Sequence, residues 1–167
     1  MNVPHRTRSS QRLYTPQERA RRDASPWTIV QGILAPIQFA VFAVSLVLVM
    51  RFLATGDGYA AATASVVVKT AVLLAIMVTG SFWERAVFGR WLFAPAFFWE
   101  DVFSMLVLAL HSAYLVALVG DLGSERDRML LALAAYAAYA INATQFLLKL
   151  RAARLETAAP PVLAVAR

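Results

Sequence analysis

The sequence predicts an all-α integral membrane protein with four transmembrane helices and both termini in the cytoplasm. Of its 167 residues, 60% are hydrophobic and only 16% are charged, whereas soluble domains carry about 25% charged residues. Four apolar stretches are each long enough to cross a hydrocarbon core, which takes about 20 helical residues. Helices are expected because lipid offers the backbone no hydrogen-bond partner and the stretches lack the alternation of barrel strands.

The four helices are expected at about residues 27–52, 60–83, 97–119 and 129–150. Charged residues lie mainly at their ends, although Lys69 falls within the second helix. Turns that contain Gly and Asp, residues 53–59 and 120–128, connect the first two and the last two helices. Residues 85–96 form the longest link, where a glycine and a proline interrupt any continuous helix. Residues 27–150 therefore form one transmembrane domain.

Basic residues predict the orientation. Most Lys and Arg residues lie in residues 85–96 and in two tails, residues 1–26 and 151–167. The positive-inside rule places all three segments in the cytoplasm. The four tryptophans, at positions 27, 83, 91 and 99, fall at this same boundary, where amphipathic rings prefer to lie. We expect the tail of residues 1–12 to attract the chain to anionic lipid and to contribute no chemistry.

Composition also excludes several kinds of site. The net charge of +6 is explained by topology and lipid attraction, and no nucleic-acid-binding module is present, so we expect no nucleic-acid partner. Zero cysteines and two histidines exclude disulfides, thiolate nucleophiles, cysteine-ligated clusters and a metal site built from several histidines. We expect no cofactor, because no motif for one is present.

Residues 81–103, SFWERAVFGRWLFAPAFFWEDVF, combine aromatic rings with the acids Glu84, Glu100 and Asp101. One interpretation is an interfacial aromatic belt with acids at helix ends, where carboxylates suit a helix N-terminus. The other is a site. An apolar wall disfavours the charged form of a carboxyl, which leaves an acid able to donate a proton near neutral pH. In this interpretation a carboxylic acid lies at the edge of an aromatic slot that faces the cytoplasm.

His111 is predicted to lie well inside the bilayer, about 16 Å along the helix from Glu100 at 1.5 Å per residue. An ionisable group there is a candidate functional residue, and imidazole is a good axial ligand for a metal inside a tetrapyrrole. The alternative is a neutral histidine that is hydrogen-bonded to one of three amide side chains in neighbouring helices, Gln38, Asn142 or Gln145. For Lys69 we expect the side chain to snorkel outward or to pair with Asp57.

Three segments resemble the 2-vinyl bacteriochlorophyllide hydratase family. They are DASPWTIVQGILAPIQF (23–39), WERAVFGRWLFAPAFFWEDVFSMLVLALHSAY (83–114) and AYAINATQFLLKLRAARL (138–155). The resemblance covers roughly residues 13 to 155. It implies a multi-pass enzyme of bacteriochlorophyll biosynthesis in the inner, cytoplasmic or photosynthetic, membrane of a phototrophic bacterium. Such enzymes add water to the C3-vinyl group of a chlorophyllide and give a 3-(1-hydroxyethyl) group.

The resemblance and the residues fit one chemistry. An acid protonates the terminal vinyl carbon, the macrocycle delocalises the resulting cation, and a carboxylate accepts a proton from the water that adds. Water is the co-substrate, and magnesium is carried by the substrate. The expected partners are the chlorophyllide and the lipid membrane, with neighbouring pathway enzymes as candidates. The oligomeric state is left open.

We assign Glu100 and Asp101 as the central catalytic pair and Glu84 as its third member. The two neighbours point about 100° apart, so one faces the slot and the other meets Glu84 or a nearby arginine. Glu100 is assigned to the slot because it shares a face with His111, and the acid and base roles are left open. Five rings are expected to pack against the macrocycle: Trp83, Trp99, Phe97, Phe98 and Phe103. His111 is the candidate axial ligand to magnesium, although its distance from Glu100 is long for one chlorin to touch both.

Two other functions remain as alternatives. A non-catalytic pigment-binding or assembly protein would use the same slot and His111, with carboxylates that only cap helices. A small multidrug or ion carrier would couple proton binding to transport, but Glu100 and Asp101 lie at a helix start, whereas carriers place their sites near the midplane.

Overall fold

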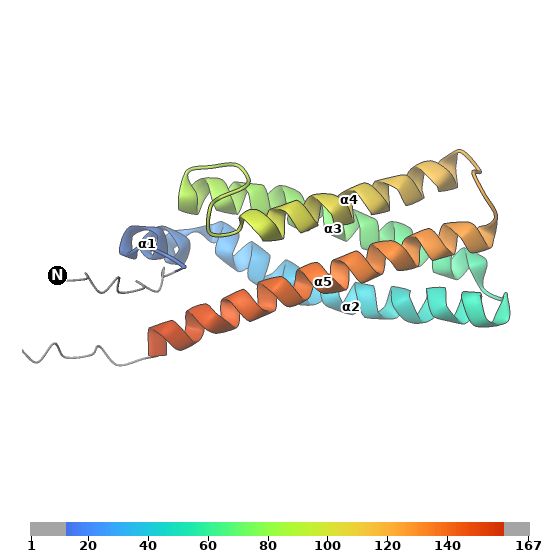
Figure 1. The fold of residues 1–167 in the computed structure, drawn as a ribbon, viewed down its shortest axis with the longest axis horizontal. Helices are drawn as coiled ribbons and strands as arrows, with labels where there is room; N and C mark the ends of the chain where they lie inside the picture. Colours follow the sequence, from blue (N-terminus) through green and yellow to red (C-terminus); the bar gives the residue numbers. More distant parts are fainter. Residues whose placement is uncertain (1–12, 159–167) are drawn as a thin grey trace, which may run out of the picture.

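The computed structural model describes residues 13–158 and contains five helices (Figure 1). They are α1 (Pro16–Ala24), α2 (Pro26–Thr55), α3 (Tyr59–Phe88), α4 (Phe98–Val119) and α5 (Glu125–Ala158). Four of them, α2 to α5, are long and apolar enough to cross a membrane. The prediction of an all-helical chain with four candidate membrane spans is therefore confirmed.

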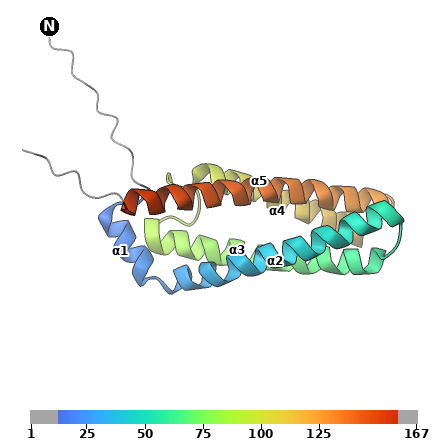
Figure 2. The same ribbon diagram turned by 90° about the horizontal axis from the view of Figure 1, so that it is seen from below.

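The four long helices form an antiparallel bundle in which α2 packs along α3 and α4 packs along α5. The short connections α2–α3 and α4–α5 lie at one end of the bundle (Figure 1). At the other end lie α1, the α3–α4 link and the last turns of α5, and α1 runs across this end (Figure 2). We call it the link end. Both ends of the described chain thus lie on one side, and whether that side is cytoplasmic stays a prediction.

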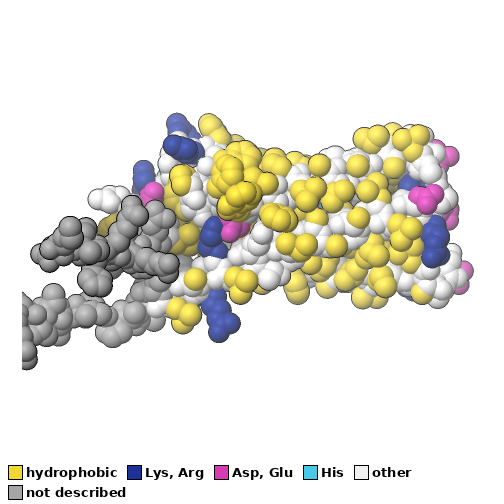
Figure 3. Space-filling model, viewed as in Figure 1, with side chains coloured by type: hydrophobic (Ala, Val, Ile, Leu, Met, Phe, Trp, Pro, Cys, Tyr) yellow, Lys and Arg dark blue, Asp and Glu magenta, His cyan; other side chains and the backbone are white. Residues whose placement is uncertain are grey.

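The outer surface fits a bilayer. On the face shown in Figure 3, charged side chains gather toward the two ends, and hydrophobic side chains cover the length between them. Large apolar side chains such as Ile29, Val47 and Leu147 are more than half exposed. In water such exposure would be costly, whereas in lipid it is the expected state.

The helix boundaries differ most from the prediction in α3 and α5. α3 continues to Phe88, beyond the predicted end at 83, so that Glu84 lies within a helix; Gly89, with φ +76°, then ends it. α5 starts at Glu125 instead of 129 and runs to Ala158, so the predicted C-terminal tail begins as helix. Polar residues at span ends lowered the apolar signal, but they continue the helix where it leaves the hydrocarbon.

The predicted basic tail contains a helix that we did not expect. Thr15 caps α1, accepting a hydrogen bond from the Glu18 amide while the Glu18 carboxylate accepts one from the Thr15 amide. This reciprocal pair and Pro16 at the first position are typical of a helix start. Residues 1–12 and 159–167 lie outside the described residues, as does the prediction made for residues 1–12.

At the end of the bundle opposite the link end, which we call the far end, the core joins three helices. Ser45 of α2 is hydrogen-bonded to Ser65 of α3, at 2.7 Å, and to Tyr136 of α5, at 2.5 Å. Small side chains of α5, Ala132 and Ala135, are fully buried beside them. Close approach at small residues, joined by hydrogen bonds between helices, is how helices associate in lipid.

Candidate active site

The three predicted acids come together at the link end of the bundle. Glu84 lies one turn before the end of α3, and Glu100 and Asp101 lie in the first turn of α4. Their exposed fractions are 5%, 6% and 5%. Three carboxyl groups that are buried so near to one another need nearby partners, because an isolated buried carboxylate is strongly disfavoured.

Part of that partnership comes from the backbone of the α3–α4 link, residues 89–97. The amide of Phe93 donates to Asp101 Oδ2 at 2.8 Å, and the amide of Ala94 donates to Glu84 Oε2 at 3.2 Å. Phe93 has φ 58°, a left-handed conformation that is uncommon for residues other than glycine. This turn directs two successive amides at two carboxyl groups, and backbone strain of this kind concentrates at functional sites.

The carboxyl groups of Glu84 and Asp101, which accept from two successive link amides, also lie close enough to interact with each other. An ionised carboxylate has no hydrogen to donate, so a hydrogen bond between two carboxyl groups needs a proton on one of them. We call Glu84 and Asp101 the carboxyl pair. From the sequence we expected either Glu100 or Asp101 to meet Glu84 or an arginine. Asp101 is the one that lies against Glu84.

Glu100 has a different partner. Its Oε2 atom forms an ion pair with Lys149 Nζ of α5 at 2.5 Å. The same ammonium group donates to the carbonyl of Ala96 and lies 5.0 Å from the centre of the Phe97 ring. Glu100 is therefore ion-paired with a cation, whereas the carboxyl groups of Glu84 and Asp101 accept hydrogen bonds from the link amides. The assignment of Glu100 as the acid in the slot stays a prediction, but its surroundings are those of an ion-paired carboxylate.

The partial charges at the two helix ends act differently on Asp101 and Glu84. Asp101 is at the N-terminus of α4, where the partial positive charge of the helix favours an anion. Glu84 is in the last turns of α3, near the partial negative charge at a helix C-terminus, which disfavours an anion. The shorter amide hydrogen bond also belongs to Asp101. Both differences favour the anion on Asp101 rather than on Glu84.

The predicted ring-binding residues fall into two groups. Trp83 and Phe97 belong to an aromatic cluster in which Tyr14 and Phe97 are buried and Trp83, Phe88 and Phe146 are partly buried. Phe98 and Trp99 instead point outward, with exposed fractions of 44% and 66%, and Phe103 is half-buried. The predicted slot is thus filled by the rings of the protein itself, and whether any of these five residues contacts a macrocycle stays a prediction.

His111 and Lys69 form a separate buried centre in the middle of the bundle. Lys69 Nζ lies 2.9 Å from His111 Nε2, His111 Nδ1 lies 2.8 Å from the carbonyl of Val107, and both side chains are fully buried. The lysine also lies 4.1 Å from the centre of the Tyr139 ring. The expectation that Lys69 snorkels outward or pairs with Asp57 is therefore wrong, since the side chain turns inward to an imidazole acceptor.

The predicted partners of His111 are also corrected. Its side chain is bonded to Lys69 and to a backbone carbonyl, and not to Gln38, Asn142 or Gln145. Both ring nitrogens are occupied, so ligation of magnesium would require Lys69 to move away. That role stays a prediction. In residues 13–158 no group of three His, Asp or Glu side chains is placed to hold a metal ion.

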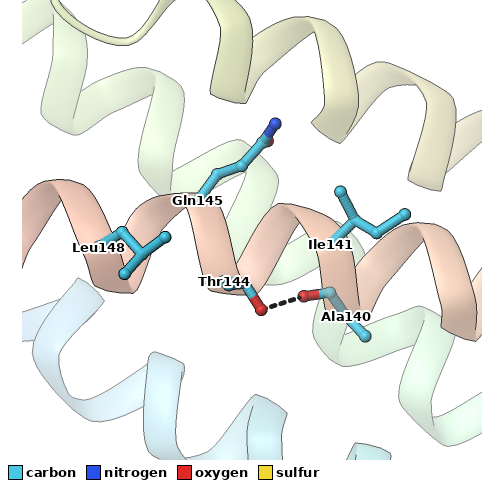
Figure 4. Close-up of a pocket in the computed structure, with 5 residues that line it drawn as sticks. All are labelled: Ala140, Ile141, Thr144, Gln145 and Leu148. Atoms are coloured by element: carbon cyan, nitrogen blue, oxygen red, sulfur yellow. Dashed lines mark hydrogen bonds between the residues drawn. The ribbon is translucent and has the colours of Figure 1, made fainter.

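Two shallow grooves lie on the outside of the bundle, away from the carboxyl groups. One, of about 350 Å³, is lined by Ala43, Val44, Val47 and Leu48 of α2. The other, of about 360 Å³, lies on α5 and is lined by Ala140, Ile141, Thr144, Gln145 and Leu148 (Figure 4). The Thr144 hydroxyl donates to the Ala140 carbonyl there and offers the groove no free donor. Neither groove borders the acids, so neither is the candidate site.

Comparison with known proteins gives the family. A model of the family described as 2-vinyl bacteriochlorophyllide hydratase matches residues 14–152. The chain belongs to this family. A protein of Rhodobacter capsulatus named 2-vinyl bacteriochlorophyllide hydratase is 64% identical over 150 residues, which are 90% of this chain and 87% of that protein. A protein of Cereibacter sphaeroides with the same name is 64% identical over 155 residues, 92% of each. No solved structure matches the chain.

The match to the hydratase family begins at Tyr14 and therefore includes α1 and the α3–α4 link. Sequence reasoning did not assign three features of this end to the site: the amides of Phe93 and Ala94, the cation Lys149, and Tyr14. Backbone amides carry no sequence signal. Lys149 looked like an ordinary charge at the end of a span. The start of α1 was readable, because Thr-Pro followed by Glu at the third helical position is a capping pattern.

Proposed function

We propose that this chain adds water to the vinyl group of a bacteriochlorophyllide, and that the carboxyl pair supplies the acid and the base. The relatives' name provides the reaction class. The observation that carries the mechanism is the pairing of Glu84 with Asp101 under two successive link amides. A protonated and an ionised carboxyl side by side are what a hydration needs, because one proton is given and one is taken.

In the first step Glu84 donates its proton to the terminal CH₂ carbon of the vinyl group, which becomes a methyl group. The positive charge then lies on the carbon attached to the ring, and the conjugated macrocycle delocalises it. Glu84 suits this role because its place at the end of α3 keeps the proton on it before substrate arrives. The burial of the site excludes bulk water, which would otherwise compete for that proton.

In the second step a water molecule attacks the cationic carbon, and Asp101 accepts the proton that this water loses. One C–H bond and one C–O bond have formed, the proton given by Glu84 is now in the methyl group, and Asp101 carries the proton that came from the water. Because the two carboxyl groups lie under successive link amides and close to each other, the proton on Asp101 can pass to Glu84, which is then protonated again. The pair is then ready for the next substrate, with no net change in protons.

Glu100 acts in this mechanism as a positioning residue. Its ion pair with Lys149 joins α4 to α5, and the same lysine fixes the carbonyl of Ala96 at the end of the link. The link in turn presents the amides of Phe93 and Ala94 to the carboxyl pair. Glu100 therefore acts through the link and does not touch the reacting carbon.

The bundle would lie in the inner membrane with its link end at the cytoplasmic interface, where a macrocycle with a polar propionate can enter from either phase. The enzyme needs no cofactor of its own for this chemistry, and the magnesium comes with the substrate. Because the product is sparingly soluble, neighbouring enzymes of the pathway are candidate partners for receiving it.

The direct test is to incubate membranes containing this chain with the vinyl chlorophyllide and to measure the pigment by mass spectrometry. The proposal expects a gain of one water molecule. In heavy water it also expects one non-exchangeable deuterium in the new methyl group, because the acid is in exchange with solvent. A chain that binds the pigment tightly and leaves its mass unchanged would instead be a pigment-binding or assembly protein.

A further inference from the structure

The aromatic cluster lies next to the carboxyl pair, about one helical turn closer to the link end. Phe88 is one turn after Glu84 on the same face of α3, and Phe97 is one turn before Asp101, whose amide donates to the Phe97 carbonyl at 3.0 Å. The two helices are antiparallel, so both rings are displaced toward the link end, and their centres are 5.9 Å apart. Space opened beside these two rings would lead to the carboxyl pair.

Tyr14 fills that space. Its ring is stacked on Phe88 with 5.8 Å between centres and only 11° between planes, and it lies 6.3 Å from the centre of Phe97. The side chain is 4% exposed. A nearly parallel stack on phenylalanine is also the geometry that a flat aromatic ligand would adopt.

Unlike the rest of the cluster, Tyr14 comes from outside the bundle. It precedes α1, a charged helix in which no residue is buried. The other end of α1 is tied down, since the Thr28 hydroxyl donates to the Arg22 carbonyl at 2.6 Å and accepts from Trp83 Nε1 at 3.0 Å. At its N-terminal end α1 is held by the buried Tyr14 ring with the partly buried Leu13 beside it, and α1 also packs against α3. A movement of α1 about Ser25 would release that ring.

We propose that the place of Tyr14 is the stacking site for the tetrapyrrole macrocycle, and that Tyr14 leaves it when the pigment binds. The proposal rests on the function proposed above and adds the site where the macrocycle stacks. We call this site the seat. A macrocycle edge stacked on Phe88 and Phe97 lies one helical turn from the carboxyl pair, so a vinyl group on that edge points at the acid. In the form described here the seat is filled, because the Tyr14 ring lies against Phe88 and Phe97.

Exposure of position 13 tests this directly. The chain contains no cysteine, so Leu13→Cys gives a single thiol beside Tyr14 and leaves the Tyr14 ring in place. We expect a maleimide to label it several-fold faster in the membrane-inserted protein when the vinyl chlorophyllide is saturating, because the departure of Tyr14 exposes both positions. The control is Asp57→Cys at the far end, whose labelling rate should not respond to pigment. A rate at position 13 that is unchanged or slowed by pigment overturns the proposal.

A second measurement does not depend on a cysteine. In a Glu84→Gln background, where turnover is expected to stop, Phe88→Ala should raise the pigment Kd by about tenfold because a stacking partner is lost. Tyr14→Ala should speed pigment association, and Tyr14→Phe, which keeps the ring, should not. Equal association rates for Ala and Phe, with a Kd unaffected by Phe88→Ala, would contradict the seat.

The two proposals fail differently. If the pigment exposes position 13 and no hydration occurs, the seat stands and the catalytic function is wrong. If hydration proceeds normally and position 13 stays protected, the function stands and the seat is wrong.

Discussion

Glu84 and Asp101 meet as a carboxyl pair although they are carried by helix ends of opposite electrostatic character. Glu84 lies near the end of α3 and Asp101 near the start of α4. The link between the two helices turns back, so that the Phe93 amide donates to Asp101 and the Ala94 amide donates to Glu84. The helix termini separate the proton affinities of two chemically similar groups. This asymmetry is why we assign the acid to one and the base to the other.

Glu100→Gln and Lys149→Met should each reduce turnover by about tenfold, well below the roughly 10²–10⁴-fold expected for loss of a general acid or base. Each change breaks the same ion pair and loosens the link. Because the two residues act as a unit, the double variant should be no worse than either single variant. Steady-state hydration rates at equal amounts of folded protein give the comparison, and a multiplicative loss in the double variant would show that Glu100 acts independently.

His111→Leu should lower the free energy of unfolding by about 1–3 kcal/mol, because it leaves the buried Lys69 donor without its acceptor. The pigment Kd should stay near that of the parent. Lys69→Met combined with His111→Leu should recover part of the stability, since both polar partners are then removed. Thermal unfolding in detergent and pigment titration measure the two effects. A weakened Kd with unchanged stability would instead support magnesium ligation by His111.

Single cysteines should report the orientation in intact cells. An impermeant thiol reagent added outside should label Asp57→Cys and spare Arg90→Cys, because the short connections face outward and the link faces the cytoplasm. Arg90 is the better link position than Gly89, whose φ of +76° would strain a cysteine. Labelling of position 90 with protection of position 57 would show that the orientation is the reverse of the predicted one.

Deletion of residues 2–12 should leave turnover per inserted molecule within a few-fold of the parent, because the segment is expected to supply membrane attraction only. The deletion keeps Tyr14 and the capping pattern of α1. Normal insertion is checked by membrane fractionation. A loss of about a hundredfold with normal insertion would assign the segment a part in closing the site.

Periodicity and composition were enough to predict the four spans, because a span must be apolar over a length that lipid dictates. Helix ends were less predictable. Residues such as Glu125 and Arg151 are charged and end an apolar run, yet their backbone continues a helix that projects beyond the hydrocarbon. The short helix α1 escaped notice because its polarity resembles that of a disordered tail, and its capping pair is a local signal outside any span.

The acids of the site were predictable from their rarity in an apolar chain, but their pairing was not. The spacing of Glu100 and Asp101 shows only that they diverge. Which of them meets Glu84 depends on how α3 and α4 are rotated, and the partner of the other acid, Lys149, lies 49 residues beyond Glu100 in the chain. Lys69 and His111 show the same limit, since 42 residues separate a lysine from the imidazole that keeps it inside.

The most direct test of the account compares hydration rates of Glu84→Gln, Asp101→Asn and Glu100→Gln with the parent, together with pigment binding. Gln and Asn preserve shape and can still bond to the link amides or to each other, but they cannot exchange a proton usefully. The account predicts losses of about 10²–10⁴-fold for Glu84→Gln and Asp101→Asn, with pigment Kd nearly unchanged, and a much smaller loss for Glu100→Gln. Full turnover in Glu84→Gln, at equal amounts of folded and pigment-binding protein, would contradict it.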